Sequence, residues 1–138
     1  MLQAGKGQVR RRQMKFYHLG IKAKDVQESL RFYCDIMGLR KIETVSIMGK
    51  NFHFVGNDTF QIEIEGGNPG DTQANASTMT GLNHISLIVE DIQALAVRLK
   101  EMGVKLLFEP LQPRPDRWTT FVQDPDGVLI QIIQYVAQ

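Results

Sequence analysis

The sequence predicts an α+β fold built from two copies of one β-α-β-β-β module. The segment 18–25, which begins with histidine and ends with aspartate, recurs 66 residues later as the segment 84–91. Each half also shows a helical apolar pattern followed by strand-like stretches, and a segment with little to bury separates the halves at residues 67–80. At 138 residues with 43% apolar content, the chain is long enough to form a single domain with a buried core.

A helix is predicted directly after the first strand of each module. Asp25 and Asp91 are preferred N-cap residues, because their side chains can accept hydrogen bonds from the free amides of a first helical turn. Apolar residues then recur at helical spacing in both halves. Gly38 and Gly103 follow these patterns, and glycine often ends helices because it adopts the left-handed conformation easily. We therefore expect helices that begin at or next to the two aspartates and end at or next to the two glycines.

Strands account for the rest of each module. Apolar and polar side chains alternate over residues 16–22 and 82–89, which predicts a first strand in each half. After the predicted helices come three further strand-like stretches in each half, at residues 40–47, 51–55 and 59–65 and then at residues 105–108, 118–123 and 129–135.

The domain organisation follows from these patterns. We expect a disordered leader over residues 1–13, a first module over 14–66, a linker over 67–80 and a second module over 81–138. The leader contains the basic run Arg10–Arg12 but lacks the apolar stretch that a secretory signal requires. The linker is rich in Gly, Asn, Ser and Thr, which is typical of a connecting segment.

Charge and cysteine content narrow the range of partners. Sixteen basic and fifteen acidic side chains leave a formal net charge of +1, which provides no global field for binding nucleic acid or acidic membranes. No apolar run is long enough to cross a bilayer. We therefore expect a small-molecule substrate, no nucleic acid and no membrane. Cys34 is the only cysteine, which favours a reducing, cytoplasmic compartment.

Side-chain parity places four polar residues on one face of the predicted sheets. Side chains alternate across a strand, and the isoleucines that flank positions 63 and 131 belong on the helix-facing side. The residues at 63 and 131 therefore share the opposite face with the two repeated histidines. A lone histidine on a strand is more often structural, but its repetition favours a shared role. We expect a single divalent cation to be bound by His18, Glu63, His84 and Gln131.

This donor set contains imidazole and oxygen but no thiolate. Nickel and zinc are the leading metals, with cobalt, manganese and iron as alternatives that ligand spacing does not distinguish. Arg114, Arg117 and Trp118 are candidates for binding a carboxylate and an apolar part of a ligand, although a solvated loop with one anchoring tryptophan explains them equally well. Glu65 fits a solvated strand end better than a supporting role beside the metal, and His53 is expected to be structural.

The chain resembles the glyoxalase, bleomycin-resistance and dioxygenase group, the vicinal oxygen chelate superfamily, over nearly all of residues 14–135. The resemblance is carried by His18, Phe32-Tyr33, Gly38-Leu39, Gly81-Leu-Asn-His84, Asp124-Pro125-Asp126-Gly127 and Ile130-Gln131-Ile132. It implies two paired modules that form a cupped sheet around a metal, commonly in homodimers with sites near the subunit interface. It also implies the four ligands named above, in a pattern closest to glyoxalase I, the lactoylglutathione lyase.

One position departs from the glyoxalase I pattern. Those enzymes usually have glutamate where this chain has Gln131, and an amide can ligate a metal but cannot accept a proton. Glu63 is then the only ligand able to act as general base.

The resemblance implies a metal-dependent lyase or isomerase that converts the hemithioacetal of a 2-oxoaldehyde into a 2-hydroxythioester by proton transfer. The alternatives are a metal-dependent epimerase of the methylmalonyl-CoA type and a non-enzymatic binding module of the bleomycin-resistance kind. An iron-dependent dioxygenase fits less well, because a facial triad of two histidines and one carboxylate leaves Gln131 unexplained.

Overall fold

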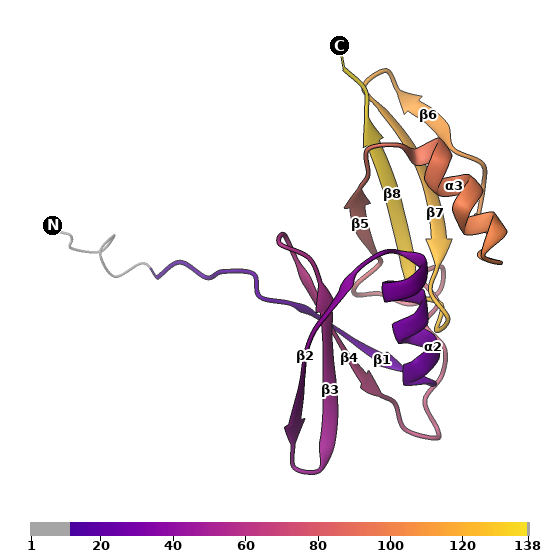
Figure 1. Cartoon of the computed structure of the whole chain (residues 1–138). Coiled ribbons are helices and arrows are strands. Elements are labelled where there is room, and N and C mark those ends of the chain that lie inside the picture. The colour runs from indigo at the N-terminus through magenta and orange to yellow at the C-terminus, as the bar shows by residue number, and fades with distance from the viewer. Residues whose placement is uncertain (1–11, 138) are drawn as a thin grey trace, which may run out of the picture.

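Strand alternation and helix capping produce the same order of elements in both halves of the chain. The computed structural model describes residues 12–137 (Figure 1). The first module contains β1 (Leu19–Ala23), α2 (Val26–Leu30), its π-helical continuation η1 (Arg31–Ile36), β2 (Arg40–Ile47), β3 (Lys50–Gly56) and β4 (Gln61–Gly66). The second module contains β5 (His84–Ile88), α3 (Ile92–Glu101), β6 (Leu111–Arg114), β7 (Arg117–Gln123) and β8 (Leu129–Tyr135). The predicted α+β fold with two β-α-β-β-β modules is confirmed.

The two four-stranded sheets have the same topology. Their strand orders are β1-β4-β3-β2 and β5-β8-β7-β6. β1 is parallel to β4 and β5 is parallel to β8, whereas the other neighbours are antiparallel. β1 and β5 are thus edge strands, and no strand among residues 12–137 pairs with their outer sides. The opposite edges are formed by β2 and β6, and the outer sides of β1 and β5 are free to accept another strand.

Both helices begin and end where the sequence predicts. The Asp25 side chain accepts hydrogen bonds from two backbone amides of the first turn of α2, and Asp91 accepts one from the first turn of α3. Gly38 and Gly103 follow the last turns with φ angles of 85° and 82°. This left-handed conformation is favourable for glycine and strained for other residues, so glycine ends each helix.

The position of one strand was predicted wrongly. Residues 105–108 contribute only an isolated bridge, between Leu106 and Val122, and β6 instead occupies Leu111–Arg114. Pro110 lies between the bridge and β6, and a proline has no amide hydrogen to donate to a neighbouring strand. β6 contains a second proline, Pro113, which is tolerated because β6 is an edge strand with an irregular register.

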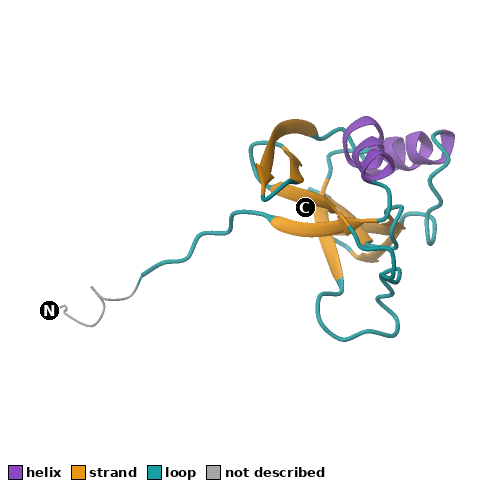
Figure 2. Cartoon of the chain, turned by 90° about the horizontal axis from the view of Figure 1, so that it is seen from below, coloured by secondary structure: helices purple, strands orange, loops and turns teal. Residues whose placement is uncertain are grey.

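The core joins the two modules on the helix side. Figures 1 and 2 show both helices on the same side of the sheets. Tyr33 of η1 and Leu99 of α3 are completely buried and belong to one apolar cluster with side chains from both sheets. Arg98 of α3 donates from Nη2 to the backbone carbonyl of Asp35 at 3.0 Å. The modules are thus held together by their helical layers.

A buried hydrogen bond also crosses between the modules. The Tyr33 hydroxyl donates to Asp124 Oδ2 at 2.8 Å, and Asp124 Oδ1 accepts from the backbone amides of Asp126 and Val128. Burial raises the pKa of Asp124 above its ordinary value, against the opposite effect of these hydrogen bonds. Asp126 Oδ1 accepts in turn from the Lys24 amide at 2.9 Å. The turn at residues 124–127 therefore fastens the second module to the first.

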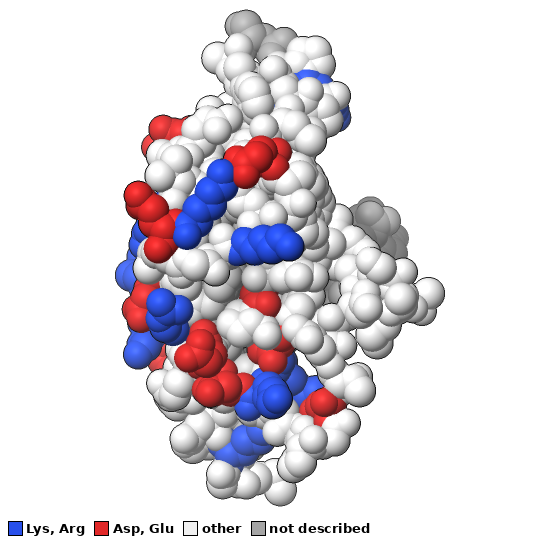
Figure 3. Space-filling view, turned by 90° about the vertical axis from the view of Figure 1, so that its right-hand side faces the viewer, with Lys and Arg blue, Asp and Glu red and all other residues white. Residues whose placement is uncertain are grey.

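The outer surface carries charges of both signs. In Figure 3, Lys and Arg side chains alternate with Asp and Glu across the helix side, which agrees with the small net charge. Within residues 12–137, no helix has the length and apolar character needed to cross a membrane. Residues 1–11 of the predicted leader lie outside the described residues. Residues 12–17 form neither helix nor strand and extend away from β1 (Figure 1).

Candidate metal centre

His18 and Glu63 form the polar pair of the first module. His18 immediately precedes β1, and Glu63 lies in β4 opposite Gly20. His18 Nε2 is 3.6 Å from Glu63 Oε2, and the two side chains are 24% and 23% exposed. Phe54, opposite Glu63 on β3, meets the imidazole edge-on with 5.0 Å between ring centroids. The pair is therefore accessible on one side and bounded by an aromatic wall on another.

His84 and Gln131 repeat this arrangement in the second module. His84 begins β5, and Gln131 lies in β8 opposite Ser86, which corresponds to Gly20 of the first module. Phe121, opposite Gln131 on β7, meets the His84 ring edge-on at 5.5 Å. The predicted parity is thus correct in both modules, because each polar residue of β4 and β8 faces the same way as its histidine.

The two histidines differ in what supports them. His84 Nδ1 is 2.6 Å from Asn83 Oδ1, and the Asn83 side-chain nitrogen donates to the Ala76 carbonyl at 3.4 Å. The amide oxygen therefore faces the imidazole, so Nδ1 donates and Nε2 keeps its lone pair for a ligand. His18 Nδ1 is buried without a hydrogen-bond partner among the described residues.

The geometry of the first pair suits a divalent metal. Two donors bound to one ion at about 2.0–2.2 Å lie roughly 3.0–3.4 Å apart at common coordination angles. The separation of 3.6 Å between His18 Nε2 and Glu63 Oε2 is close to this range and longer than a good hydrogen bond. Neither atom is therefore committed to the other, and the nitrogen and oxygen donors match those that zinc and nickel accept.

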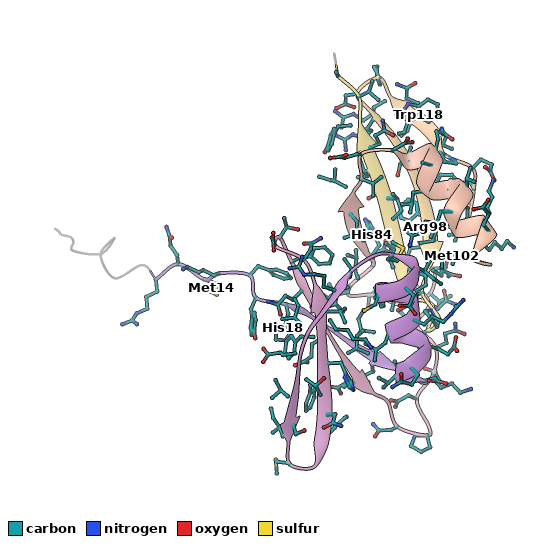
Figure 4. All side chains as sticks on the ribbon, in the orientation of Figure 1. Met14, His18, His84, Arg98, Met102 and Trp118 are labelled. Carbon is teal, nitrogen blue, oxygen red and sulfur yellow. The ribbon has the colours of Figure 1, made fainter. Side chains whose placement is uncertain are left out.

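One chain does not bring the four predicted ligands together. Within residues 12–137, no group of three or more His, Cys, Asp and Glu side chains is arranged to hold a metal ion. Figure 4 places His18 and His84 in separate modules. An open cavity of about 1040 Å³ lies between β1, the linker and β5 and is lined by His84. The chain thus presents two half-sites, and the four-ligand centre stays a prediction.

Arg114 and Arg117 flank the turn between β6 and β7. Both form ion pairs with Asp116 in that turn, at 3.3 Å and 3.4 Å. The hydrogen bond from Arg117 holds the pKa of Asp116 below its ordinary value. The Arg117 guanidinium also lies over the Tyr135 ring, 4.8 Å from its centroid. Strand parity places Arg117 on the same face as Phe121, so it remains a candidate for ligand binding.

Trp118 occupies the other face, which corrects its expected role. It lies opposite Gln134, whose side chain accepts a hydrogen bond from the Ile92 amide at the start of α3. The indole packs against the apolar core. Figure 4 shows it far from His84. Trp118 is therefore an anchor between sheet and helix rather than a residue of the site face.

Glu65 and His53 have partners of their own. Glu65 Oε1 is 3.2 Å from Lys50 Nζ, at the open end of the first sheet. His53 Nδ1 is 3.2 Å from the Thr44 hydroxyl. The contact of His53 agrees with its expected structural role, whereas Glu65, expected to be solvated, is only 24% exposed and paired with a lysine.

Sequence reasoning missed three residues that support the second half-site. Asn83 contacts His84, and the hydroxyls of Ser86 and Thr119 contact Gln131. Parity places Ser86 on the face of His84, but it does not indicate the contact with Gln131 on the neighbouring strand. No sequence signal marks Thr119, because its contact depends on the register between β7 and β8.

Comparisons with known proteins agree with this architecture. A family model for the Glyoxalase/Bleomycin resistance protein/Dioxygenase superfamily matches residues 15–132. A protein named probable lactoylglutathione lyase from Synechocystis sp. is 33% identical over 129 residues, which cover 88% of this chain and 95% of that protein. A glyoxalase family protein from Bacillus cereus has a TM-score of 0.78 at 16% identity, covering 93% of this chain and 98% of its own. Glyoxalase I from Leishmania major has a TM-score of 0.72 at 20% identity, and the match covers 88% of this chain and 87% of that protein. This chain therefore belongs to the glyoxalase, bleomycin-resistance protein and dioxygenase superfamily.

Proposed function

We propose that two copies of this chain share each metal centre, one copy providing the histidine–glutamate pair and the other the histidine–glutamine pair. At this centre the hemithioacetal of a 2-oxoaldehyde and a thiol becomes a 2-hydroxythioester. The observation that carries the proposal is the repetition of one polar pair, in one register, beside two strand edges that no described strand covers. The relative named probable lactoylglutathione lyase supports the reaction class.

Exposed apolar side chains at these edges support assembly into a homodimer. Leu82 and Ile88, beside and within β5, are 84% and 70% exposed, and Phe16, just before β1, is 77% exposed. We infer that these side chains become covered when two copies assemble. If β1 of one copy lies beside β5 of the other, these side chains become buried and the polar pairs face each other. Two-fold symmetry then produces two equivalent centres and a cupped sheet around each.

The four proposed ligands have different chemical roles. A bound divalent ion, nickel or zinc in the first instance, would polarise adjacent substrate oxygens and so acidify the neighbouring C–H bond. Glu63 is the only ligand that can accept a proton at neutral pH, since Gln131 offers a neutral amide oxygen. The Glu63 carboxylate takes the proton from the carbon that bears sulfur and returns it to the adjacent carbon. The Phe54 ring, which contacts His18, would shield one side of this pair from water.

Arg114 and Arg117 provide a place for an anionic part of the thiol. They share one carboxylate, Asp116, so the three side chains together carry a net positive charge at the end of the β6–β7 hairpin. A carboxylate on a small thiol would pair with this charge while its sulfur reaches the metal centre. A small thiol of this kind fits the reducing, cytoplasmic compartment that the lone cysteine favours.

A second candidate function is an epimerase of the methylmalonyl-CoA type, because the mixed set of two histidines, one glutamate and one glutamine resembles the ligand set of those enzymes. With one carboxylate and one amide among the ligands, a proton can be removed but the second half-site cannot return one. Such a site can still epimerise an acidic carbon if the substrate turns or water returns the proton.

Metal analysis and a thioester assay on tag-free protein test the proposal. We expect about one divalent metal per chain, a dimer by light scattering, and thioester formation from methylglyoxal with at least one of glutathione, coenzyme A or another small thiol. A metal-loaded dimer that forms no thioester but exchanges the α-hydrogen of an acyl-coenzyme A with solvent deuterium would support the epimerase instead. A protein that binds no metal would contradict both and leave a binding module.

A further inference from the structure

A chain of three hydrogen bonds fixes the Gln131 side chain. The Ser86 hydroxyl donates to Gln131 Oε1 at 2.6 Å. Gln131 Nε2 donates to Thr119 Oγ1 at 3.3 Å, and the Thr119 hydroxyl donates to the Ile132 carbonyl at 3.0 Å. Thr119 is buried, at 6% exposed. We refer to Ser86 and Thr119 together as the Gln131 clamp.

The direction of these bonds selects an amide at position 131. A hydroxyl has one hydrogen to donate, and Thr119 gives its hydrogen to a backbone carbonyl. Thr119 can therefore only accept from residue 131, while Ser86 donates to that residue. An amide satisfies both neighbours because it has one donating and one accepting end. A carboxylate would place an oxygen against the lone pairs of Thr119 Oγ1.

The first module has no counterpart of this clamp. Gly20 occupies the position of Ser86, and a Cβ atom added there would contact only Glu63 Oε1, at 3.7 Å. Glu63 thus has no hydroxyl donor on the neighbouring strand, although there is space for one. The equivalent ligand positions of the two modules are held by different means.

We infer that Ser86 and Thr119 are positioning residues that hold Gln131 as a fixed neutral ligand, while Gly20 leaves Glu63 free to move with a proton. The orientation of Gln131 follows from these hydrogen bonds alone. Its consequence for the metal rests on the function proposed above. The clamp presents Oε1, which keeps one lone pair for the metal while the other accepts from Ser86.

NMR of the metal-free protein tests the clamp directly. The two side-chain amide hydrogens of Gln131 are assigned by their loss in Gln131→Glu. In the wild type we expect their chemical shifts to differ from those of solvated glutamines. We also expect a high order parameter for this side-chain amide, as in a rigid group. Ser86→Ala should return both properties towards solvated values, and Ser86→Thr, which keeps the hydroxyl, should restore them. Unchanged Gln131 signals in Ser86→Ala would overturn the inference.

Ser46→Ala is the matched control. The Ser46 hydroxyl also donates to a side-chain amide oxygen, that of Asn51, but at the end of the β2–β3 hairpin. Ser46→Ala should therefore leave the Gln131 signals unchanged. Metal dissociation constants then give a second readout, measured by chelator competition. Ser86→Ala should raise the constant by about 10- to 100-fold, and Ser86→Thr and Ser46→Ala should not.

The two measurements separate failure of the clamp from failure of the proposed function. A wild-type protein that binds no metal would contradict the shared centre, whereas the Gln131 amide signals would still decide the clamp. If the Gln131 amide is rigid but the metal dissociation constant is the same in Ser86→Ala as in the wild type, the positioning role is overturned and the metal centre remains.

Discussion

The first module places Glu63 opposite a glycine, whereas the second places Gln131 opposite a serine in the same register. Backbone and strand order are alike in the two modules. The difference is confined to side chains, one of which can accept a proton while the other is held by hydroxyls. A repeated fold therefore fixes where the two proposed ligands lie, and the residue on the neighbouring strand determines how freely each side chain can move.

The turns that precede β4 and β8 show a second difference. Asn57 in the first module closes its own turn by accepting from the amide and hydroxyl of Thr59. Asp124 in the second module closes its turn in the same way but also accepts from Tyr33 of the first module. The second turn therefore contributes a hydrogen bond to the contact between modules.

The largest expected effect separates the two half-sites. Glu63→Gln keeps an oxygen donor of similar shape and removes the proton acceptor, so turnover should fall by about 10²- to 10⁴-fold while metal content stays near the wild-type value. Gln131→Glu is the matched change in the other module and should alter turnover far less, because Glu63 remains. Rates of thioester formation and metal content measure both. Equal losses from the two substitutions would contradict the unequal roles.

A smaller effect tests the contact between modules. Tyr33→Phe leaves Asp124 buried without the Tyr33 hydroxyl, so the free energy of unfolding should fall by about 1.5–3 kcal/mol. Tyr17→Phe, which removes the hydroxyl of an exposed tyrosine, is the control and should have little effect. Urea denaturation of metal-free protein measures both variants. A loss for Tyr33→Phe no larger than that of the control would show that the buried bond does not hold the modules together.

The smallest effect should be the same in both modules. Gly38→Ala and Gly103→Ala each place a Cβ in the left-handed conformation, and nothing lies within 4 Å of either added atom. Each should lower the free energy of unfolding by about 1–2 kcal/mol through backbone strain alone. Urea denaturation measures both variants. A difference of more than about 1–2 kcal/mol between their free energies of unfolding would contradict equivalent helix ends.

Local signals in the sequence predicted most of the fold. Asp25 and Asp91 cap the helices, and the isoleucines of β4 and β8 take the helix side, because capping and alternation depend on near neighbours. The apolar character of residues 105–108 predicts a strand there, but these residues form only an isolated bridge. Parity within β7 would also have placed Trp118 with the buried residue Val122.

The arrangement of the site depends on contacts that local patterns do not encode. His18 and His84 share a parity, but parity does not say whether their modules face each other within one chain. The contact between Tyr33 and Asp124, 91 residues apart, instead joins the helix of the first module to the β7–β8 turn of the second. The two half-sites therefore lie beside the edge strands of two different sheets. This separation is evident only from the tertiary structure.

Complementation between two inactive variants tests the shared centre most directly. His18→Ala removes a ligand from one half-site and His84→Ala removes one from the other, so each variant alone should form no thioester. When the two are mixed and allowed to exchange subunits, each mixed dimer should contain one intact centre and one doubly altered centre. We predict that roughly a quarter of wild-type activity returns at full exchange, as two-fold symmetry requires. A mixture that stays inactive although mass spectrometry shows mixed dimers would contradict a centre shared between two copies.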